Sequence, residues 1–542
     1  MPLVAAQSGH ITLLTVAEAG NEKIGGVADL YLEIESGSGR IFIDSFPLTK
    51  LDTQISTRFA NEIACQQLDL DCSKKDFFYT ISADSTIVGG PSAGSGVAVL
   101  TAAVMKGLEL DPKIAITGTM NSGGIIGPVA GVAEKVDAAA EAGLTKVVIP
   151  SWVSYNETGS RIEVVRAGNL EEALLAFTGM EFNGMAHEIE ISEKYQDRME
   201  AVADILCERA TSLEHELENN GKEYNDSSNY TARTESALNN SKFYTAASFC
   251  FSRNVELRQE FLEDELNLNL LLKVRDLSKA IGKLDKESDE RQLLTLSDLE
   301  TYMIVKERLV EAAQMLSKIN LGNISTPNLG YAIERYFSAV AWSNFFGLGG
   351  KKYSLNNQYL SIACQQKISE AEERLDYVGT IRANILAETQ AELDLAYKDR
   401  RDKNYPLCMF KASKAKAEAD MFLLAISVKE EDVNRIVGGK LLATKRVILE
   451  QQENEIFPIL GYSYYEYADS LKEANPSSAL LFSEYALEMS NLNMYFPQEE
   501  EEESWEFPDL DLQLIILFMW GIIIGFLIAQ LVQLKPRKKS KN

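Results

Sequence analysis

Histidine, positive charge and paired cysteines are scarce in this sequence, and each shortage excludes a class of site. The 542 residues include three histidines and six cysteines, and no two cysteines form a CxxC pair. Structural zinc sites need clustered thiol and imidazole ligands, so we expect no metal site and no cofactor. Acidic residues outnumber basic ones by 80 to 53, which gives a formal net charge of −27. This balance disfavours a nucleic-acid surface, because phosphate binding needs clustered lysine and arginine.

The cysteines leave their redox state open. Their even number permits disulfides, and Cys65 and Cys72 lie close enough in sequence to pair. Free cysteine is also among the most buried residue types, and we favour buried thiols over disulfides here. The compartment does not follow from the cysteines alone.

The length of the chain suggests two to four domains of ordinary size. Residues 10–182 alternate short apolar runs with alanine-rich helical stretches and glycine turns, which predicts a mixed α and β domain. Residues 183–242 hold a charged stretch of helical period, 184–217, and then a polar stretch rich in Asn and Ser, 219–242, which we interpret as a linker or loop. Residues 243–497 show an almost purely helical pattern and predict an all-α domain.

Three segments of the predicted all-α domain share a spacing of aromatic and small residues, centred on Phe251, Phe410 and Phe482. The third, with the segment before it, has the pattern of a tetratricopeptide helix pair, which would form a stacked helical array. The distances between the three segments are irregular, so ordinary amphipathic helices remain the alternative. Either arrangement of helices would offer a surface for a protein partner.

The C-terminal region predicts one transmembrane helix. Residues Leu512–Leu534 contain no charged residue over 23 positions, and a helix of that length exceeds the roughly 30 Å hydrocarbon core of a bilayer. An acidic stretch, 498–511, precedes it and is expected to form a solvated stalk. A basic tail, 535–542, follows it and carries five Lys or Arg residues.

The charge asymmetry around this stretch predicts its topology. Short basic flanks stay on the cytoplasmic side, so we expect a single-pass protein of the cell membrane with a cytoplasmic tail and an extracytoplasmic body. Within residues 1–9, Val4–Ala6 resembles the end of a signal-peptide cleavage site. The alternative is a tail-anchored protein with a cytoplasmic body.

The first segment that carries chemistry is DSTIVGGPSAGSGVAVLTAAVMKGL, in which glycines and Pro91 end a strand and Ser92 opens an apolar helix. A serine in such a turn presents its hydroxyl. Nearby backbone N–H groups at a helix N-terminus, for which Gly90 and Ala93 are the candidates, can stabilise an oxyanion. A plain helix-capping serine is the alternative interpretation.

The second segment is IAITGTMNSGGIIGPVAGVAEKVDAAAEAGLTKVVIP. Lys135 lies in a predicted helix that begins near Gly131, among Val132, Val136 and Ala139. Burial in apolar surroundings disfavours the ammonium form and lowers the pKa of lysine. A neutral lysine can act as a general base and accept the proton of a serine.

Together the two segments resemble the proteolytic domain of Lon-type Ser-Lys proteases. The matching residues are the turn 91–94 (PSAG), the segment 131–135 (GVAEK), Ala138-Ala139, Gly143 and Ile149-Pro150. The resemblance covers roughly residues 10–180. It implies an α+β fold of the Lon proteolytic type, Ser92 as nucleophile and Lys135 as general base.

The resemblance also implies that the Thr117 hydroxyl, at the start of the family's TG turn, orients the lysine amine. It suggests an archaeal, membrane-anchored serine endopeptidase, and leaves a homo-oligomer open. The chain departs from the family pattern at Gly89 and Thr119, where acidic residues are usual, and at Ala130, where the pattern has glycine. These departures leave the substrate specificity undetermined.

No ATPase motif is present in this sequence. None of the GK pairs belongs to a GxxxxGK[ST] phosphate-binding loop. We therefore expect ATP-independent hydrolysis of unfolded proteins or peptides. Two alternatives stay open: a catalytically silent membrane scaffold whose helical domain binds partners, and a protease served by a separate unfoldase, which requires a cytoplasmic body.

Overall fold

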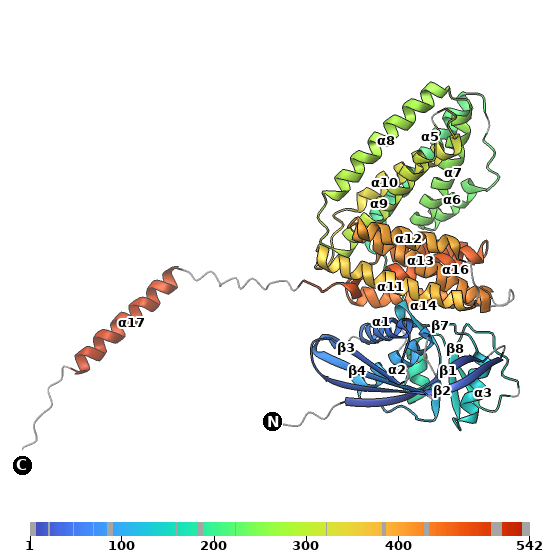
Figure 1. Cartoon of the computed structure of the whole chain (residues 1–542). Helices are drawn as coiled ribbons and strands as arrows, with labels where there is room; N and C mark the ends of the chain where they lie inside the picture. The colour runs from blue at the N-terminus through green and yellow to red at the C-terminus, as the bar shows by residue number, and fades with distance from the viewer. Residues whose placement is uncertain are drawn as a thin grey trace, which may run out of the picture. The chain divides into compact units, whose positions relative to one another are not determined.

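The chain forms two compact units, residues 1–498 and 499–542 (Figure 1). Val4–Ala6, Gly89, most of the predicted stalk and the tail 535–542 lie outside the described residues. The computed structural model describes residues 7–19, 22–46, 48–68, 70–83, 90–158, 160–181, 188–222, 224–320, 322–381, 386–427, 433–499 and 512–533.

A mixed sheet organises the α/β part of the large unit, residues 7–181. Among the described residues, seven strands run in the order β3-β4-β2-β1-β5-β8-β9, and β6 and β7 form a separate hairpin. β1, β5, β8 and β9 are mutually parallel, whereas β2 pairs antiparallel with β1 and β4. The strands are β1 (Gln7–Ala19), β2 (Glu22–Ser36), β3 (Ile41–Phe46), β4 (Lys75–Ala83), β5 (Ile114–Ile116), β6 (Thr119–Asn121), β7 (Ile125–Gly127), β8 (Lys146–Pro150) and β9 (Glu163–Ala167).

Helices cover both faces of this sheet. α1 (Leu51–Gln67), α2 (Gly94–Lys106) and α4 (Leu170–Thr178) pack on one face, and α3 (Val132–Glu141) packs on the other. The division follows the period-2 alternation of strands: in β5, Ile114 and Ile116 join the core under α2, whereas Ala115 joins the core under α3. The predicted mixed α and β domain is confirmed.

Small residues let α2 approach the sheet closely. A Cβ atom added at Gly96 would lie 2.2 Å from Leu13 Cδ2, and one added at Gly94 would lie 2.9 Å from the Met120 backbone nitrogen. The GSG sequence at the start of α2 thus brings the preceding PSA turn against the carboxyl end of β5. This turn is a short 3-10 helix, η2 (Pro91–Ala93).

The helical part, residues 188–498, confirms the predicted all-α pattern. Its helices pack as neighbouring pairs, among them α5 with α7, α9 with α10, α11 with α13 and α15 with α16. The tetratricopeptide interpretation stays a prediction. The helices are α5 (Glu193–Asn219), α6 (Tyr230–Asn239), α7 (Phe243–Glu263), α8 (Asn267–Asp289), α9 (Leu296–Ser317), α10 (Thr326–Trp342), α11 (Asn357–Ile381), α12 (Ala387–Arg401), α13 (Tyr405–Ser427), α14 (Val433–Glu453), α15 (Ile459–Leu471) and α16 (Pro476–Ser490).

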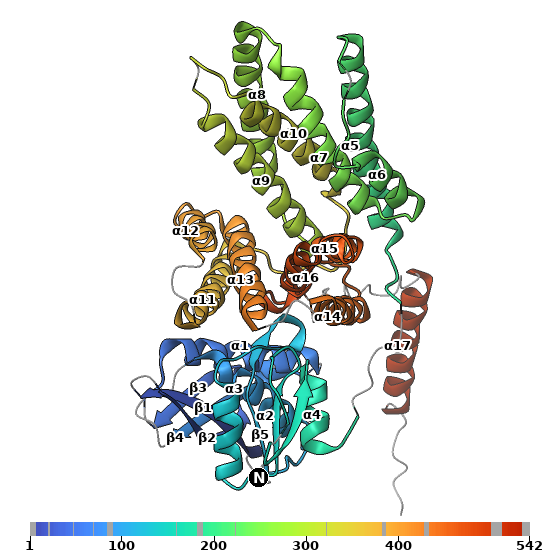
Figure 2. The same ribbon diagram turned by 90° about the vertical axis from the view of Figure 1, so that its right-hand side faces the viewer.

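The helical part and the α/β part are one compact unit. α11 packs against α1, and α14 packs against the turn that joins β6 to β7 (Figures 1 and 2). The interpretation of 219–242 as a linker or loop is wrong for residues 230–239, because α6 forms there. Thr234 and Ala237 of α6 are buried, and α6 packs against α7. The polar composition of this stretch reflects a helix with one narrow buried face.

A cluster of buried charges lies where α11, α13, α14 and α16 meet. Lys367 and Lys416 Nζ each lie 2.7 Å from a carboxylate oxygen of Glu488, and Lys440 Nζ lies 2.5 Å from Glu484. Burial raises the pKa of Glu373 in the same cluster to about 8. Removing one partner of a buried pair costs about 3–5 kcal/mol, so the cluster fixes how these helices pack.

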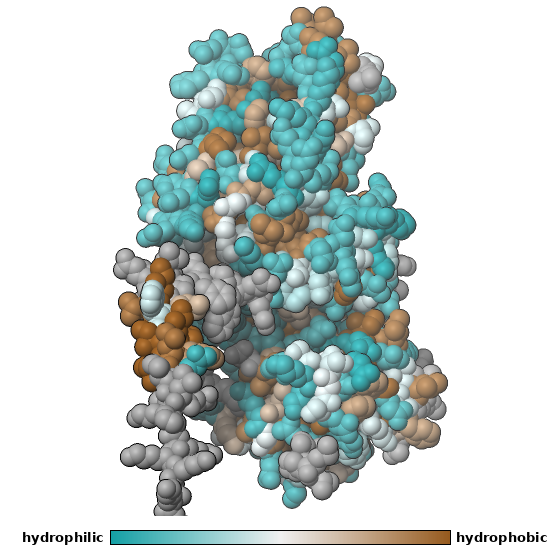
Figure 3. Space-filling view, turned by 90° about the vertical axis from the view of Figure 1, so that its left-hand side faces the viewer, coloured by the Kyte–Doolittle hydropathy of each residue, from teal (hydrophilic) through white to brown (hydrophobic). Residues whose placement is uncertain are grey.

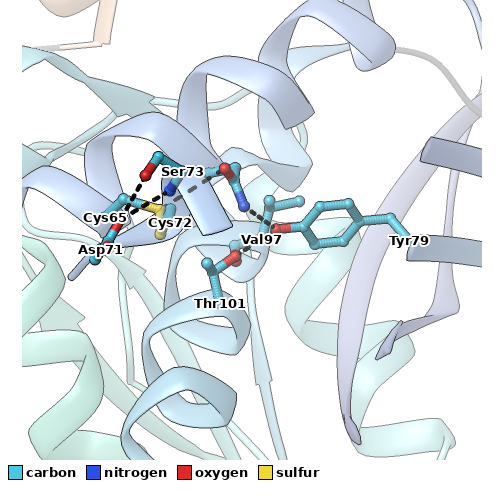
Figure 4. Close-up of a disulfide and its surroundings, with 8 residues drawn as sticks. Cys65, Asp71, Cys72, Ser73, Tyr79, Val97 and Thr101 are labelled. Atoms are coloured by element: carbon cyan, nitrogen blue, oxygen red, sulfur yellow. Dashed lines mark hydrogen bonds between the residues drawn. A yellow bond between two sulfur atoms is a disulfide. The ribbon is translucent and has the colours of Figure 1, made fainter. Parts of the chain in front are cut away.

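All six cysteines form disulfides, so the preference for buried thiols is wrong. The pairs are Cys65–Cys72, Cys207–Cys250 and Cys364–Cys408. The last two bridge packed helices, α5 with α7 and α11 with α13, which brings together cysteines more than forty residues apart. Figure 4 shows Cys65–Cys72 at the end of α1, beside a hydrogen-bond chain from Tyr79 to Thr101 of α2.

The second unit contains α17 (Leu512–Gln533). Its side chains are described over 516–530, where all are exposed and most are apolar, as the brown surface in Figure 3 shows. Within the described part of the chain, no helix is long and apolar enough to cross a membrane. This finding does not support the predicted transmembrane helix at Leu512–Leu534.

Candidate active site

The carboxyl end of β5 is the centre of the candidate site. Thr117 and Gly118 follow the last residue of the strand, at the edge where parallel strands present ligand-binding and catalytic groups. The Gly118 N–H donates to the Ser92 carbonyl at 3.1 Å, and the Ser95 N–H donates to the Gly118 carbonyl at 2.9 Å. These two backbone hydrogen bonds hold the turn that carries Ser92 against the end of β5.

Lys135 reaches the same point from the other face of the sheet. It lies in the first turn of α3, whose N-cap is Gly131 in the left-handed conformation, with φ of 67°. The Lys135 side chain is 2% exposed, and its Nζ donates a hydrogen bond to Thr117 Oγ1 at 3.0 Å. Burial lowers the pKa of Lys135 to about 7. The lysine therefore exists in substantial part as a neutral amine near neutral pH.

The three residues Ser92, Thr117 and Lys135 thus meet at one place, although they come from three elements. Thr117 accepts from Lys135, and its neighbour Gly118 bonds to Ser92. Ser92 is partly exposed, whereas Thr117 and Lys135 are buried. No hydrogen bond joins Ser92 Oγ directly to Lys135 Nζ in this described region. Catalytic hydrogen bonds are often formed only when substrate is bound.

The first two turns of α1 support the serine turn, which the sequence did not suggest. The Gly90 N–H donates to Asp52 Oδ2 at 3.1 Å, and the Ser56 hydroxyl donates to the Pro91 carbonyl at 3.3 Å. Gly90 therefore does not offer a free N–H to an oxyanion, which corrects its predicted role. Ala93 lies in η2 and remains a candidate. Asp52 is distant from the turn in sequence, and no motif marks it.

Two residues of α11 also contact the site and were missed by the sequence analysis. The Arg374 guanidinium donates to the Met120 carbonyl in β6 at 2.5 Å, and the Ala130 N–H donates to the Tyr377 hydroxyl at 2.7 Å. Both residues lie in a segment that reads as an ordinary amphipathic helix. The sequence of that segment alone does not indicate a role at the site, because the role depends on how the helical part packs on the α/β part.

Part of the chain is similar to a known protein family. Residues 60–159 match the family model of the Lon protease (S16) C-terminal proteolytic domain, and this range includes Ser92, Thr117 and Lys135. This segment is therefore similar to the proteolytic domain of Lon proteases, as the motifs indicated. This match supports a serine protease function.

Individual relatives agree with the family model. An archaeal Lon protease of Thermoplasma volcanium is 34% identical over 93 residues, which cover 16% of this chain and 14% of the relative. An archaeal Lon protease of Archaeoglobus fulgidus is 34% identical over 92 residues, 16% of this chain and 15% of the relative. A Lon protease of Methylocella silvestris is 34% identical over 114 residues, 20% of this chain and 14% of the relative. The chain therefore matches only a small share of these relatives' length.

Burial of a neutral lysine has a consequence for stability that does not depend on catalysis. Above about pH 7 folded Lys135 is unprotonated, whereas the unfolded chain keeps that proton up to about 10.5. The unfolded state binds more protons in this window, so wild-type stability rises with pH, by up to roughly 1.4 kcal/mol per pH unit. Lys135→Met lacks this slope. Urea unfolding should show the variant more stable at pH 7, with an advantage that shrinks towards pH 10.

Lys440→Met is the matched control, because Lys440 is equally buried but paired with Glu484 at 2.5 Å. Its loss leaves a buried carboxylate without its cation, so this variant should be less stable than the wild type at pH 7. A difference between Lys135→Met and wild type that does not change with pH would contradict a neutral Lys135.

Proposed function

We propose that this protein is a serine endopeptidase that cleaves peptide bonds with Ser92 as nucleophile and Lys135 as general base. The observation that carries the proposal is the buried Lys135 amine, which is held by Thr117 while the next residue, Gly118, holds the Ser92 turn. A serine hydroxyl is a weak nucleophile until a neighbouring base removes its proton. A lysine kept partly neutral by burial can be that base.

The proposed reaction has two halves. Neutral Lys135 Nζ accepts the Ser92 hydroxyl proton as Oγ attacks the carbonyl carbon of the peptide bond. The tetrahedral intermediate collapses, the C–N bond breaks, and the Lys135 ammonium returns the proton to the leaving amine. Water then attacks the acyl-enzyme ester with Lys135 again as base, and the proton passes back to Ser92 as the carboxylate product leaves. The Thr117 hydroxyl, as acceptor for Lys135 Nζ, keeps the amine directed to the site.

We propose that catalysis is independent of ATP and acts on unfolded proteins or peptides. The support is the lack of a GxxxxGK[ST] loop in the 542 residues. Without an attached unfoldase, a folded substrate must open by itself before its backbone can enter the site. The helical part is proposed to bind a protein partner or the substrate chain.

Ser92→Ala, Lys135→Ala and Lys135→Arg should each abolish cleavage of a casein-like unfolded substrate, because each removes one half of the proton-transfer unit. Arginine fails because its guanidinium does not lose its proton in this pH range. In the wild type, kcat/KM should fall as pH drops below about 7, where Lys135 becomes protonated. Cleavage is measured with a fluorescent substrate and folding by circular dichroism.

The control is Lys146→Ala, which removes a partly exposed lysine of β8 that pairs with Glu163. This variant should keep wild-type activity. Activity retained in any of the three site variants refutes the Ser-Lys assignment. A wild type that cleaves nothing, in the presence of partners that bind the helical part, favours the scaffold alternative.

Detergent-solubilised full-length protein should cleave the unfolded substrate at the same rate with and without ATP and magnesium. The reason is that the proposed chemistry uses only the residues at the carboxyl end of β5. The two rates are compared in one pure preparation, with a folded substrate as the second test, which should resist cleavage in both. A rate that rises on addition of ATP contradicts the proposal.

We also propose a location in the cell membrane, single-pass, with the body extracytoplasmic and the C-terminal tail cytoplasmic. This proposal is supported by the sequence, through the 23 uncharged residues Leu512–Leu534 and the basic residues after them. The three disulfides fit it, because disulfides persist mainly in oxidising compartments.

Protease added to intact spheroplasts should digest the body and leave a tag placed after Asn542 protected, because the proposed topology puts only the tail inside. Immunoblotting of the tag gives the result, and lysed spheroplasts are the control in which the tag is also lost. If the body becomes digestible only after lysis, this topology is refuted and the tail-anchored alternative with a cytoplasmic body is favoured.

A further inference from the structure

Helix α11 of the helical part contacts both chain segments that carry the buried half of the candidate site. Arg374 and Tyr377 are three residues apart, so they lie on one face of the helix. Arg374 Nη2 lies 2.5 Å from the Met120 carbonyl oxygen and 2.7 Å from Asn121 Oδ1, both in β6. The Tyr377 hydroxyl accepts the Ala130 N–H at 2.7 Å.

The two contacted segments adjoin the site directly. β6 begins at Thr119, two residues after Thr117. Ala130 precedes Gly131, the N-cap of α3, and the Lys135 N–H donates to the Gly131 carbonyl at 3.0 Å. The strand that follows Thr117 and the segment that precedes α3 are therefore each hydrogen-bonded to one residue of α11.

The geometry of Arg374 is rigid. Its side chain is 2% exposed, its Nε lies 2.9 Å from Asp420, and its Nη1 donates to Glu373 Oε1 at 3.0 Å. A planar guanidinium held by two carboxyl groups on one side presents its remaining N–H groups in fixed directions. A shift of α11 would therefore move β6, and with it the end of β5.

We propose that Arg374 and Tyr377 are positioning residues of the proteolytic site, through which α11 sets the placement of Thr117 relative to Lys135. The proposal rests on the proposed function, and it deepens that function: the helical part is a component of the active enzyme as well as a surface for partners.

The test uses the full-length protein with Arg374→Lys and Tyr377→Phe, each of which keeps the bulk of the side chain. Lysine cannot reproduce the paired contacts to β6, and phenylalanine cannot accept the Ala130 N–H. We expect kcat to fall about tenfold to a hundredfold, as for a misplaced catalytic group, with KM within about twofold. The acid limb of the pH profile of kcat should shift, because the surroundings of Lys135 change.

Matched controls are Arg308→Lys and Tyr485→Phe. Arg308 is buried, and among the described residues its hydrogen bonds go to Ser338 and the Ile304 carbonyl of the helical part. The Tyr485 hydroxyl donates to Glu418, also within the helical part. If α11 acted only through stability, these variants would affect kcat as much as the test variants. We expect them to leave kcat and the pH profile unchanged.

Two further measurements test the proposal and need no activity assay. In Tyr377→Phe, hydrogen exchange at the Ala130 amide should become faster than in the wild type and in Tyr485→Phe. In both test variants, nuclear magnetic resonance of ε-¹³C-lysine, assigned with Lys135→Arg, should show a shifted Lys135 titration. An unchanged titration, or wild-type kcat in both test variants, overturns the proposal. An inactive wild type refutes the proposed function instead, and the titration then decides the role of α11.

Discussion

The end of β5 is the structural centre of the site, because the segment Thr117–Asn121 contacts three other parts of the protein. Its backbone holds the serine turn, the Thr117 hydroxyl holds the lysine, and Met120 and Asn121 receive the guanidinium of Arg374. All five residues are buried, so each contact must be satisfied within the protein. The buried lysine is tolerated here because it needs no proton, which distinguishes it from the paired lysines of the helical part.

The central part of the site follows from sequence, because its residues lie in short segments with strong local rules. The glycines and proline before Ser92 favour a turn, and the alanine-rich stretch around Lys135 favours a helix with an apolar face. The structure has both elements at these positions. The supporting residues did not follow. Asp52 lies 38 residues before Gly90, whose N–H it accepts. The contributing residues of α11 lie beyond residue 370. Such long separations in sequence leave no local pattern from which a contact could be predicted.

The fold was likewise predictable in its local elements but not in their packing. Strand alternation and helical period identified the α/β and helical parts, but not how they pack. Charged residues of α11, α13, α14 and α16 are buried in mutual pairs, which the helical pattern of the sequence does not predict. Cys207 and Cys250 pair because α5 packs on α7, and the pairing of helices is a tertiary fact that periodicity does not contain. Helix α6 was not predicted from the sequence, because its buried residues are only Thr234 and Ala237.

The disulfides respect the boundary between the two parts. Cys65–Cys72 lies within the α/β part, and the other two pairs lie within the helical part. With all six cysteines used, no covalent cross-link spans the interface, which is held by hydrogen bonds, packing and buried charge. Each part is therefore cross-linked internally, whereas the interface between the two parts is noncovalent. Separation of the two parts would therefore require no change of oxidation state at any cysteine.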